Sequence, residues 1–394
     1  MIEDFVFQNT TKVYFGREQM QHLGEEVSQY GRKVLMVYGG GSIKRNGLYD
    51  RIMKEMEKSG VSVLELAGVE PNPRHTTVNR GAKLCREEKV DVILAVGGGS
   101  TIDCSKGISG LSMAEGTDDI WELVEKGTPC KNGIPIVVVL TMAATGSEMD
   151  SGAVISNMEK NKKEAIFGSA LQPRAVFEDP TNTFTVPAYQ TACGSFDIMS
   201  HIFDVEYFSA GDTMDMLKRI QEEVLKTVIK YAPVAIKEPD NYEARANLMW
   251  ASSWALNSFL YDGHTQATVA HAMEHELSAY YDITHGHGLA ILTPRWLEYI
   301  LDENTAPEIA RFGKRCMGVD ENLEDMEAAK AAIAALNDFC FTDKGLGLKS
   351  HLKELGIDET NFEAMAESAC RGGVLPSIKP LNKEDIINIY RMCS

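Results

Sequence analysis

The first half of the chain alternates short apolar, β-branched runs with amphipathic stretches of helical period. Four such runs occupy residues 34–38, 61–66, 90–96 and 134–140. As a set they lack the regular apolar–polar alternation of strands that face solvent on one side, so we expect helices to cover both faces. Strands that alternate with helices form parallel sheets, because each crossover connection is itself a helix. The pattern therefore predicts an α/β fold with an interior parallel sheet.

From about Pro187 onward the pattern becomes helical. Long stretches in which apolar residues recur with helical spacing occupy residues 191–208, 214–232 and 241–261, without strand-like runs between them. The segment 179–187, in which Pro and Thr interrupt both patterns, separates the two halves. A chain of 394 residues is longer than one ordinary core requires. We therefore predict an α/β domain over residues 1–186 and an all-helical domain over residues 187–394.

The charge balance narrows the classes of partner. The formal net charge is −18, which repels phosphate backbones and anionic lipid, so we expect neither nucleic acid nor membrane as a partner. The first residues carry acids where a signal peptide needs bases, and no run approaches the length of a membrane span. Eight cysteines without a C-x-x-C pair are typical of reduced, buried thiols. Together these features predict a cytoplasmic protein.

Two turns of sequence GGGS directly follow apolar runs, at residues 39–42 and 97–100. Ligands of parallel sheets collect beyond the carboxyl ends of the strands, where glycines let backbone N–H groups approach a phosphate. Neither turn fits G-x-G-x-x-G, because Lys44 and Ile102 occupy the sixth positions. The turns alone therefore do not establish a dinucleotide site. A tight strand-to-helix connection is the structural alternative.

A third predicted strand ends in residues 141–148, which supply several hydroxyl groups. The hydroxyls of Thr141 and Thr145 would suit a phosphate or a nicotinamide amide. Capping of the next segment by Thr145 or Ser147 is the alternative. Because carboxyl ends of parallel strands share one edge of a sheet, we expect all three loops to converge there.

Histidines gather in the second half of the chain. Five of the nine lie between residues 264 and 287, and His201 follows Asp197 by four residues. Residues four apart on a helix share a face, so Asp197 and His201 can offer an oxygen and a nitrogen to one ion. His271 and His275 repeat that spacing. A single histidine is more often satisfied by hydrogen bonds, but the group predicts a metal site.

His285 imposes a geometric condition on that site. It follows His271 by fourteen residues, about 21 Å along a straight helix, whereas two ligands of one ion lie within roughly 4 Å. If both bind one ion, the chain must bend back near Asp282. One carboxylate with neutral imidazoles leaves a divalent ion with residual positive charge, suited to polarising a carbonyl or stabilising an alkoxide. Ligands of this kind, without thiolate, suit zinc, ferrous iron or cobalt.

Residues 271–275 also match H-x-x-E-H, an inverted zinc-peptidase motif in which Glu274 would be the base. That interpretation would make the chain a hydrolase. It leaves Asp197, His201 and the glycine turns without a role, so we give it less weight.

Taken together, the motifs resemble those of the iron-containing alcohol dehydrogenase family, and especially its butanol dehydrogenase branch. They are the two GGGS turns, T-x-A-x-T-G-S-E at 141–148, D-x-x-x-H at 197–201, and H-x-x-x-H-E-L at 271–277 with a His fourteen beyond its first. The resemblance covers essentially the whole chain. It implies a dinucleotide-binding α/β domain, an all-helical metal-binding domain, a dehydroquinate synthase-like fold and a homodimer.

The resemblance also implies roles for individual residues. The metal ligands would be Asp197, His201, His271 and His285, and His275 would lie beside the nicotinamide without binding the metal. Asp103 would support the 97–100 loop. The cofactor contacts implied on the three loops and beyond them are Gly40, Gly41, Ser42, Lys44, Gly97, Gly98, Gly99, Ser100, Asp103, Thr141, Thr145 and Lys163.

The implied activity is that of an NAD(P)-dependent alcohol dehydrogenase acting on short linear alcohols and aldehydes such as butanol and butanal. Members of the family that prefer NAD tend to carry an acid after the first strand, where this chain has glycines at 39–41. Ser42, Lys44 and Arg45 follow and would suit a 2′-phosphate, which favours NADP(H) over NAD(H). Exposure of Lys44 and Arg45 to solvent is the alternative. His275 is the candidate proton relay.

Two other classes remain as alternatives. One is a metal- and NAD-dependent lyase or synthase of the same fold, and the other is a nucleotide-binding protein without activity. Dehydroquinate-synthase-like relatives use fewer histidines and a glutamate at the metal, whereas an inactive relative should have lost ligands. The sequence matches neither pattern.

Overall fold

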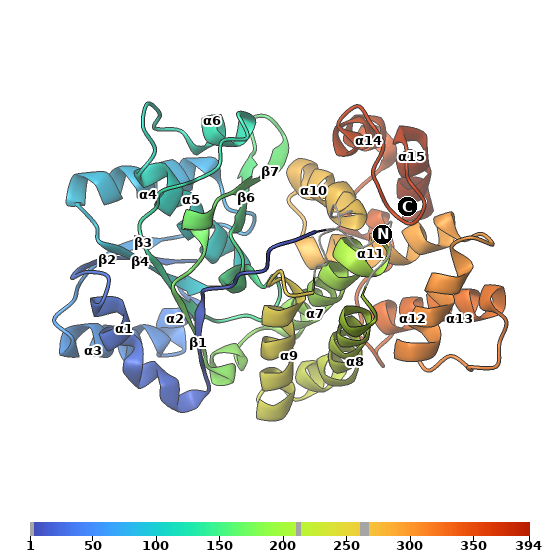
Figure 1. Cartoon of the computed structure of the whole chain (residues 1–394), viewed down its shortest axis with the longest axis horizontal. Coiled ribbons are helices and arrows are strands. Elements are labelled where there is room, and N and C mark those ends of the chain that lie inside the picture. The colour runs from blue at the N-terminus through green and yellow to red at the C-terminus, as the bar shows by residue number, and fades with distance from the viewer. Residues whose placement is uncertain (1–3, 210–213, 261–267) are drawn as a thin grey trace. The chain divides into compact units, whose positions relative to one another are not determined.

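The computed structural model describes residues 4–209, 214–260 and 268–394. The chain forms two compact units (Figure 1). The α/β unit comprises Gln8–Val186. The helical unit comprises Pro187–Ser394 together with the described residues before Gln8.

The α/β unit contains a six-stranded sheet in which every neighbouring pair is parallel. The four runs predicted from the sequence are four of its strands, so the predicted parallel α/β fold is confirmed. The sequence pattern did not single out the strand β8 or a separate antiparallel hairpin, β6–β7. Across the sheet the strands are β1 Lys12–Phe15, β8 Ala175–Glu178, β5 Ile136–Leu140, β4 Val92–Gly97, β2 Lys33–Tyr38 and β3 Ser62–Ala67, and the hairpin is β6 Gly152–Asn157 and β7 Lys162–Phe167.

Helices cover both faces of this sheet (Figure 1). Leu35 and Val37 of β2 belong to one core cluster, whereas Val34 and Met36 belong to the other. Successive residues of a strand point to opposite faces, so both faces of β2 are buried, and residues 34–38 are all apolar. The first cluster includes residues of α4 and α5, and the second includes residues of α1 and α3. The helices are α1 Leu23–Ser28, α2 Ser42–Arg45, α3 Leu48–Lys58, α4 His75–Glu88, α5 Gly99–Ser112 and α6 Ile120–Glu125.

The strand register brings three loops to one edge of the sheet. Tyr38 pairs with Val96, and Gly97 pairs with Leu140. Because these strands are parallel, the loops that follow β2, β4 and β5 leave the sheet at the same edge. The 39–42, 97–100 and 141–148 segments therefore lie where the sequence placed them.

The helical unit has no strand among its described residues, apart from an isolated bridge between Leu375 and Leu381. Two helices predicted from the sequence are present as α7 and α8, and α7 continues into a π-helical turn, Phe203–Tyr207. The third predicted stretch begins as α9, and its last residue, Tyr261, lies outside the described residues. The helices are α7 Ala188–Ile202, α8 Asp215–Lys237, α9 Tyr242–Ala255, α10 Val269–Tyr281, α11 His285–Ile300, α12 Ala306–Cys316, α13 Asp325–Phe341, α14 Phe362–Cys370 and α15 Lys383–Met392.

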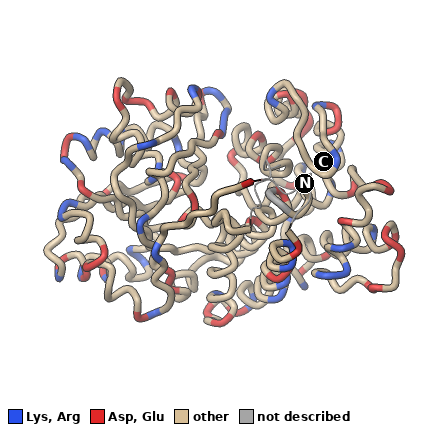
Figure 2. Tube along the Cα trace, in the orientation of Figure 1, with Lys and Arg blue, Asp and Glu red and all other residues tan. Residues whose placement is uncertain are grey.

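The structure also shows where the charged residues and the cysteines lie. Acidic and basic residues both occur along the trace of each unit (Figure 2). All eight cysteines lie in the described residues, where they are buried and form no disulfide. In the part of the chain that the structure describes, no helix has the length and apolarity that crossing a bilayer requires.

Candidate functional site

Helix α7 supplies the first two groups of a buried cluster in the helical unit. Asp197 and His201 lie one helical turn apart and therefore share a face. Both are buried, and Nδ1 of His201 lies 3.8 Å from Oδ1 of Asp197. The spacing predicted that these two side chains would meet, and they do.

A sharp bend brings two more histidines to the same place. Helix α10 ends at Tyr281, Asp282 adopts a left-handed conformation with φ of 51°, and α11 begins at His285. The bend that the fourteen-residue spacing demanded is thus present at Asp282. It places the rings of His271 and His285 with their centroids 5.2 Å apart.

Three imidazole nitrogens surround one carboxylate oxygen. Nε2 of His271 and Nε2 of His285 lie 3.9 and 3.7 Å from Oδ1 of Asp197, and the nitrogen of His201 is equally close. Ligand atoms of Asp197, His201 and His271 all lie within 4.8 Å of one another, as ligands of one ion would, and His285 reaches the same carboxylate oxygen but groups with Glu274 and His275. Nδ1 of His201 and Nε2 of His271 are buried and have no hydrogen-bond partner among the described residues. Buried polar atoms rarely lack a hydrogen-bond partner. As electron-pair donors, these two nitrogens suit coordination of a metal ion.

Two further carboxylates hold the histidines in orientation. Oδ2 of Asp204 accepts hydrogen bonds from Nδ1 and from the backbone N–H of His271, at 2.8 and 2.7 Å. Oε2 of Glu274 bonds Nδ1 of His285, and its Oε1 accepts a 2.5 Å bond from the hydroxyl of Ser278. Asp204 and Glu274 are almost fully buried. Binding at Nδ1 fixes the tautomer, so Nε2 of each ring is left to face Asp197.

The orienting roles of Asp204 and Glu274 were not predicted from the sequence. A weak signal existed, because Asp204 follows His201 by three residues and Glu274 follows His271 by three, so each carboxylate shares a helix face with a predicted ligand.

The structure also bears on the peptidase interpretation. Both oxygens of Glu274 are engaged within the protein, which leaves them poorly placed to act as a general base on water.

Burial and neighbouring charge act differently on two of the histidines. Burial, followed by the nearby His271 and His285, lowers the pKa of His201 well below its ordinary value. Burial also lowers the pKa of His271, but the hydrogen bond to Asp204 and the charges of Asp204 and Asp197 outweigh it and raise the pKa overall. Since a metal binds neutral imidazole, His201 is ready to bind, whereas at His271 an ion must compete with a proton.

His275 lies beside this cluster. Its ring centroid is 5.5 Å from that of His285 and 6.3 Å from that of His271. His287 has a different role, because its two ring nitrogens bond the Tyr189 hydroxyl at 3.0 Å and the Lys349 carbonyl at 2.9 Å. It is a structural histidine of the core. The fifth histidine of the sequence cluster, at position 264, lies outside the described residues.

In the α/β unit, the 97–100 turn joins β4 to α5 and packs closely on the loop after β5. A Cβ atom added to Gly98 would lie 3.2 Å from the side chain of Met142, and one added to Gly99 would lie 2.3 Å from that of Thr145. The glycines are therefore needed for this contact, as the structural alternative supposed. The turn lies at the carboxyl edge of the sheet, where parallel sheets commonly bind ligands, and the fourteen-residue helix α5 follows it.

Asp103 on α5 bonds the chain segment that follows β5. Its carboxylate accepts a 2.6 Å bond from the hydroxyl of Ser147 and a 2.9 Å bond from the backbone N–H of Val154. Burial raises the pKa of Asp103 to about 6. One helical turn on, the buried ammonium of Lys106 donates to Asp150 at 2.7 Å. These bonds join α5 to the segment that follows β5.

The remaining predicted contacts of this edge fall on two loops and a strand. The backbone N–H of Thr141 donates to Gly97 at 3.0 Å, which ties the two loops together. Oγ1 of Thr145 accepts a 3.1 Å bond from the backbone N–H of Ser147, in a local turn, whereas the N-cap of the following 3-10 helix is Gly146, without a side-chain cap. Lys163 lies in β7 and is buried, so it is not a solvated surface lysine.

The 39–42 turn joins β2 to the short helix α2. Gly41 has φ of 87°, which favours glycine, and a Cβ atom added to Gly40 would meet nothing within 4 Å. Lys44 on α2 does not simply face solvent. Its ammonium lies 3.1 Å from Oε2 of Glu65 on β3, a partner that the sequence did not reveal.

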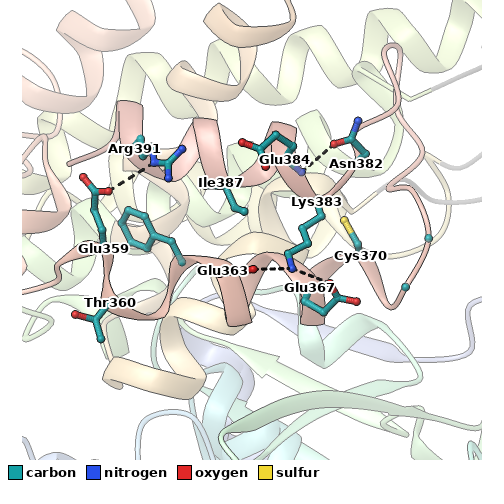
Figure 3. A pocket seen from close by; sticks show the side chains of 13 residues that line it. Glu359, Thr360, Glu363, Glu367, Cys370, Asn382, Lys383, Glu384, Ile387 and Arg391 are labelled. Carbon is teal, nitrogen blue, oxygen red and sulfur yellow. Dashed lines mark hydrogen bonds and ion pairs between the residues drawn. The ribbon is translucent and has the colours of Figure 1, made fainter.

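An open pocket of about 750 Å³ lies elsewhere in the helical unit, between α14 and α15 (Figure 3). Its charged side chains pair with one another, since Lys383 bonds Glu363 and Glu367, and Arg391 bonds Glu359. None of the clustered histidines lines it. We therefore place the chemistry at the histidine cluster and not in this pocket.

Comparison with known proteins identifies the family. The family model for iron-containing alcohol dehydrogenase matches residues 10–180, and the model for the C-terminal part of the Fe-containing alcohol dehydrogenase family matches residues 191–393. The chain is 47% identical to NADH-dependent butanol dehydrogenase B of Clostridium acetobutylicum, over 98% of this chain and 99% of that protein. It is 35% identical to the NADPH-dependent aldehyde reductase YqhD of Escherichia coli, over 92% of each.

A solved structure extends the likeness to three dimensions. The crystal structure of NADH-dependent butanol dehydrogenase A of Thermotoga maritima matches with a TM-score of 0.92 and 37% identity. The match covers 100% of this chain and 99% of that one.

Proposed function

The chain belongs to the iron-containing alcohol dehydrogenase family, and within that family we propose that it interconverts short linear alcohols and aldehydes, such as butanol and butanal. It is an NAD(P)-dependent, metal-dependent oxidoreductase, as its relatives are. The proposal of a four-carbon substrate rests on the relatives named butanol dehydrogenases. The single observation that carries the proposal is the arrangement of three imidazole nitrogens about Oδ1 of Asp197.

The four proposed metal ligands are Asp197, His201, His271 and His285. A divalent ion bound to them would polarise a carbonyl and stabilise negative charge on its oxygen. His285 is the most accessible of the four, with 22% of its side chain exposed against at most 10% for the others. We therefore propose that substrate approaches on the side of His285. The oxygen and nitrogen donors suit Fe²⁺, with Zn²⁺ and Co²⁺ as alternatives.

His275 is the proposed proton relay. Its ring lies beside that of His285, on the side from which we expect substrate to approach. Imidazole titrates nearest neutral pH and can both give and accept a proton, which reduction and oxidation require in turn. In aldehyde reduction His275 would supply the proton that the product oxygen needs.

The three loops at the sheet edge are the proposed cofactor site. Gly97, Gly98 and Ser100 would hold the pyrophosphate, with Thr141 near phosphate or ribose. Gly99 and Asp103 would act through the loop rather than by direct contact, because one packs on Thr145 and the other bonds Ser147 and Val154. Thr145 and Lys163 complete the set proposed to border the cofactor.

We propose NADP(H) as the preferred cofactor, with NAD(H) also accepted. The support is the absence of a side chain at residues 39–41, followed by Ser42, Lys44 and Arg45. The relatives divide on this point, since the butanol dehydrogenases are named for NADH and the aldehyde reductase for NADPH.

We also propose a homodimer that works in the cytoplasm, where eight buried cysteines without a disulfide are typical.

Steady-state kinetics test the proposed activity. Metal-loaded protein should consume NADPH and NADH with linear aldehydes of increasing length, and butanal should give one of the highest values of kcat/KM. Net consumption of the reduced cofactor separates this reaction from that of a lyase or synthase, which regenerates its cofactor. A preparation that holds metal and binds nucleotide, yet consumes neither cofactor with any aldehyde, would reject the proposed function.

A further inference from the structure

The positive charge of Lys44 is balanced by the carboxylate of Glu65 within a small cluster of side chains. Its ammonium lies 3.1 Å from Oε2 of Glu65 and stands over the rings of Tyr38 and Tyr49, at 5.2 and 4.4 Å from their centroids. Cations bind both to carboxylates and to aromatic faces. Its positive charge is therefore engaged within the protein before any ligand arrives.

Glu65 is held in place by two tyrosine hydroxyls. Tyr38 donates to Oε2 at 2.5 Å, and Tyr49 donates to Oε1 at 2.6 Å. The bonds from Tyr38 and Tyr49 lower the pKa of Glu65, so the group is a carboxylate at neutral pH. The sequence alone could not reveal this arrangement, because Glu65 lies twenty-one residues beyond Lys44 and on β3, whereas Lys44 lies on α2.

Tyr38 and Lys44 of this cluster flank the glycine turn at 39–42, where we proposed that the 2′ position of the cofactor is recognised, so any role for the cluster in cofactor choice rests on the proposed function. A carboxylate accepts a hydrogen bond from a ribose 2′-hydroxyl but repels a 2′-phosphate. A lysine does the reverse and attracts the phosphate. Lys44 and Glu65 therefore act in opposite directions on the choice between NADPH and NADH.

We propose that Glu65 is a specificity-determining residue that limits the preference for NADPH and keeps NADH usable. The pair is partly exposed, with side-chain exposures of 47% for Lys44 and 35% for Glu65, so its effect is moderate. We expect a change in selectivity of roughly 1.5- to 5-fold when one charge is removed, the size of a partly exposed charge contact.

The test measures the ratio of kcat/KM for NADPH to that for NADH with butanal. Glu65→Gln keeps a hydrogen-bonding side chain between the tyrosines and should raise the ratio, whereas Lys44→Gln should lower it. The double variant should return toward the wild-type ratio. Glu122→Gln on α6 is the matched control, because Glu122 forms a comparable exposed pair with Lys126 at 3.0 Å outside the proposed site.

Calorimetric binding of adenosine 2′,5′-bisphosphate and adenosine 5′-monophosphate gives a readout that does not need turnover. Glu65→Gln should strengthen binding of the bisphosphate relative to the monophosphate by a similar factor. An unchanged or reduced ratio in both assays, with wild-type protein active, would overturn the role of Glu65 alone. Wild-type protein that binds neither nucleotide and reduces no aldehyde would instead overturn the proposed function.

Discussion

The residues of the histidine cluster differ in how far sequence could predict them. Asp197 and His201 are four apart in one helix, so their contact follows from helical period alone. The bond between His271 and Asp204 joins residues 67 apart, and only the fold brings them together. Spacing within α7 could therefore predict that Asp197 and His201 meet, whereas the full set of proposed ligands followed from the family resemblance, and the orienting carboxylates required the tertiary structure.

Replacing Glu274 by glutamine tests the orienting role. The variant replaces the carboxylate at Nδ1 of His285 by a weaker, neutral partner, and we expect metal affinity to fall about 10-fold or more. Competition with a chromogenic chelator measures this directly. Glu276→Gln is the control, since Glu276 is also buried on α10 but accepts a hydrogen bond from Ser368. Equal loss of affinity in both variants would show a general effect of burial and remove the specific role.

Replacing two neighbouring histidines separates metal binding from proton transfer. His271→Ala should lose both metal and activity, because it removes a proposed ligand. His275→Ala should retain metal and lose turnover by about 10²-fold or more, the usual contribution of a general acid. Metal analysis of the purified variants alongside kcat distinguishes these outcomes. If His275→Ala kept full activity, water or another group would have to supply the proton.

At the scale of elements, the strands and the bend at Asp282 followed from sequence pattern. The apolar runs became β2, β3, β4 and β5, and the central strands β4 and β5 are buried along their whole length, which explains their continuous apolar sequence. The hairpin β6–β7 was not predicted, since its six-residue strands are mixed in polarity and depend on packing against α5. The glycine turns were located correctly, but the contacts that require their glycines were not visible in the sequence.

Gly99→Ala tests the close packing of two loops. The new Cβ would lie 2.3 Å from the side chain of Thr145, which cannot yield without disturbing its bond to Ser147. We expect a loss of about 1–3 kcal/mol in the free energy of unfolding and a higher KM for the cofactor. Urea denaturation and kinetics measure these two effects.

Adding Thr145→Ala should recover part of the lost stability in the Gly99→Ala variant, because it removes the two atoms nearest the new methyl group. Gly373→Ala is the control, since a Cβ there would meet only one atom, at 3.6 Å. A Gly99→Ala protein as stable as the wild type would show that the loops are not tightly packed on each other.

At the scale of the whole molecule, the two proposed sites fall in different compact units. The proposed metal ligands lie between residues 197 and 285 of the helical unit, whereas the cofactor loops lie between residues 39 and 163 of the α/β unit. Each unit buries its own core and holds its own site residues in place. The metal centre must therefore form from the helical unit's own side chains.

Titration of metal-stripped protein with ferrous ion, without oxygen, tests this proposed centre most directly, with bound metal and NADPH oxidation by butanal followed in the same samples. We predict that activity rises in proportion to bound metal and saturates at one ion per chain, and that Asp197→Ala abolishes both signals. Turnover that does not depend on bound metal, or tight metal binding that persists in Asp197→Ala, would contradict the proposed centre.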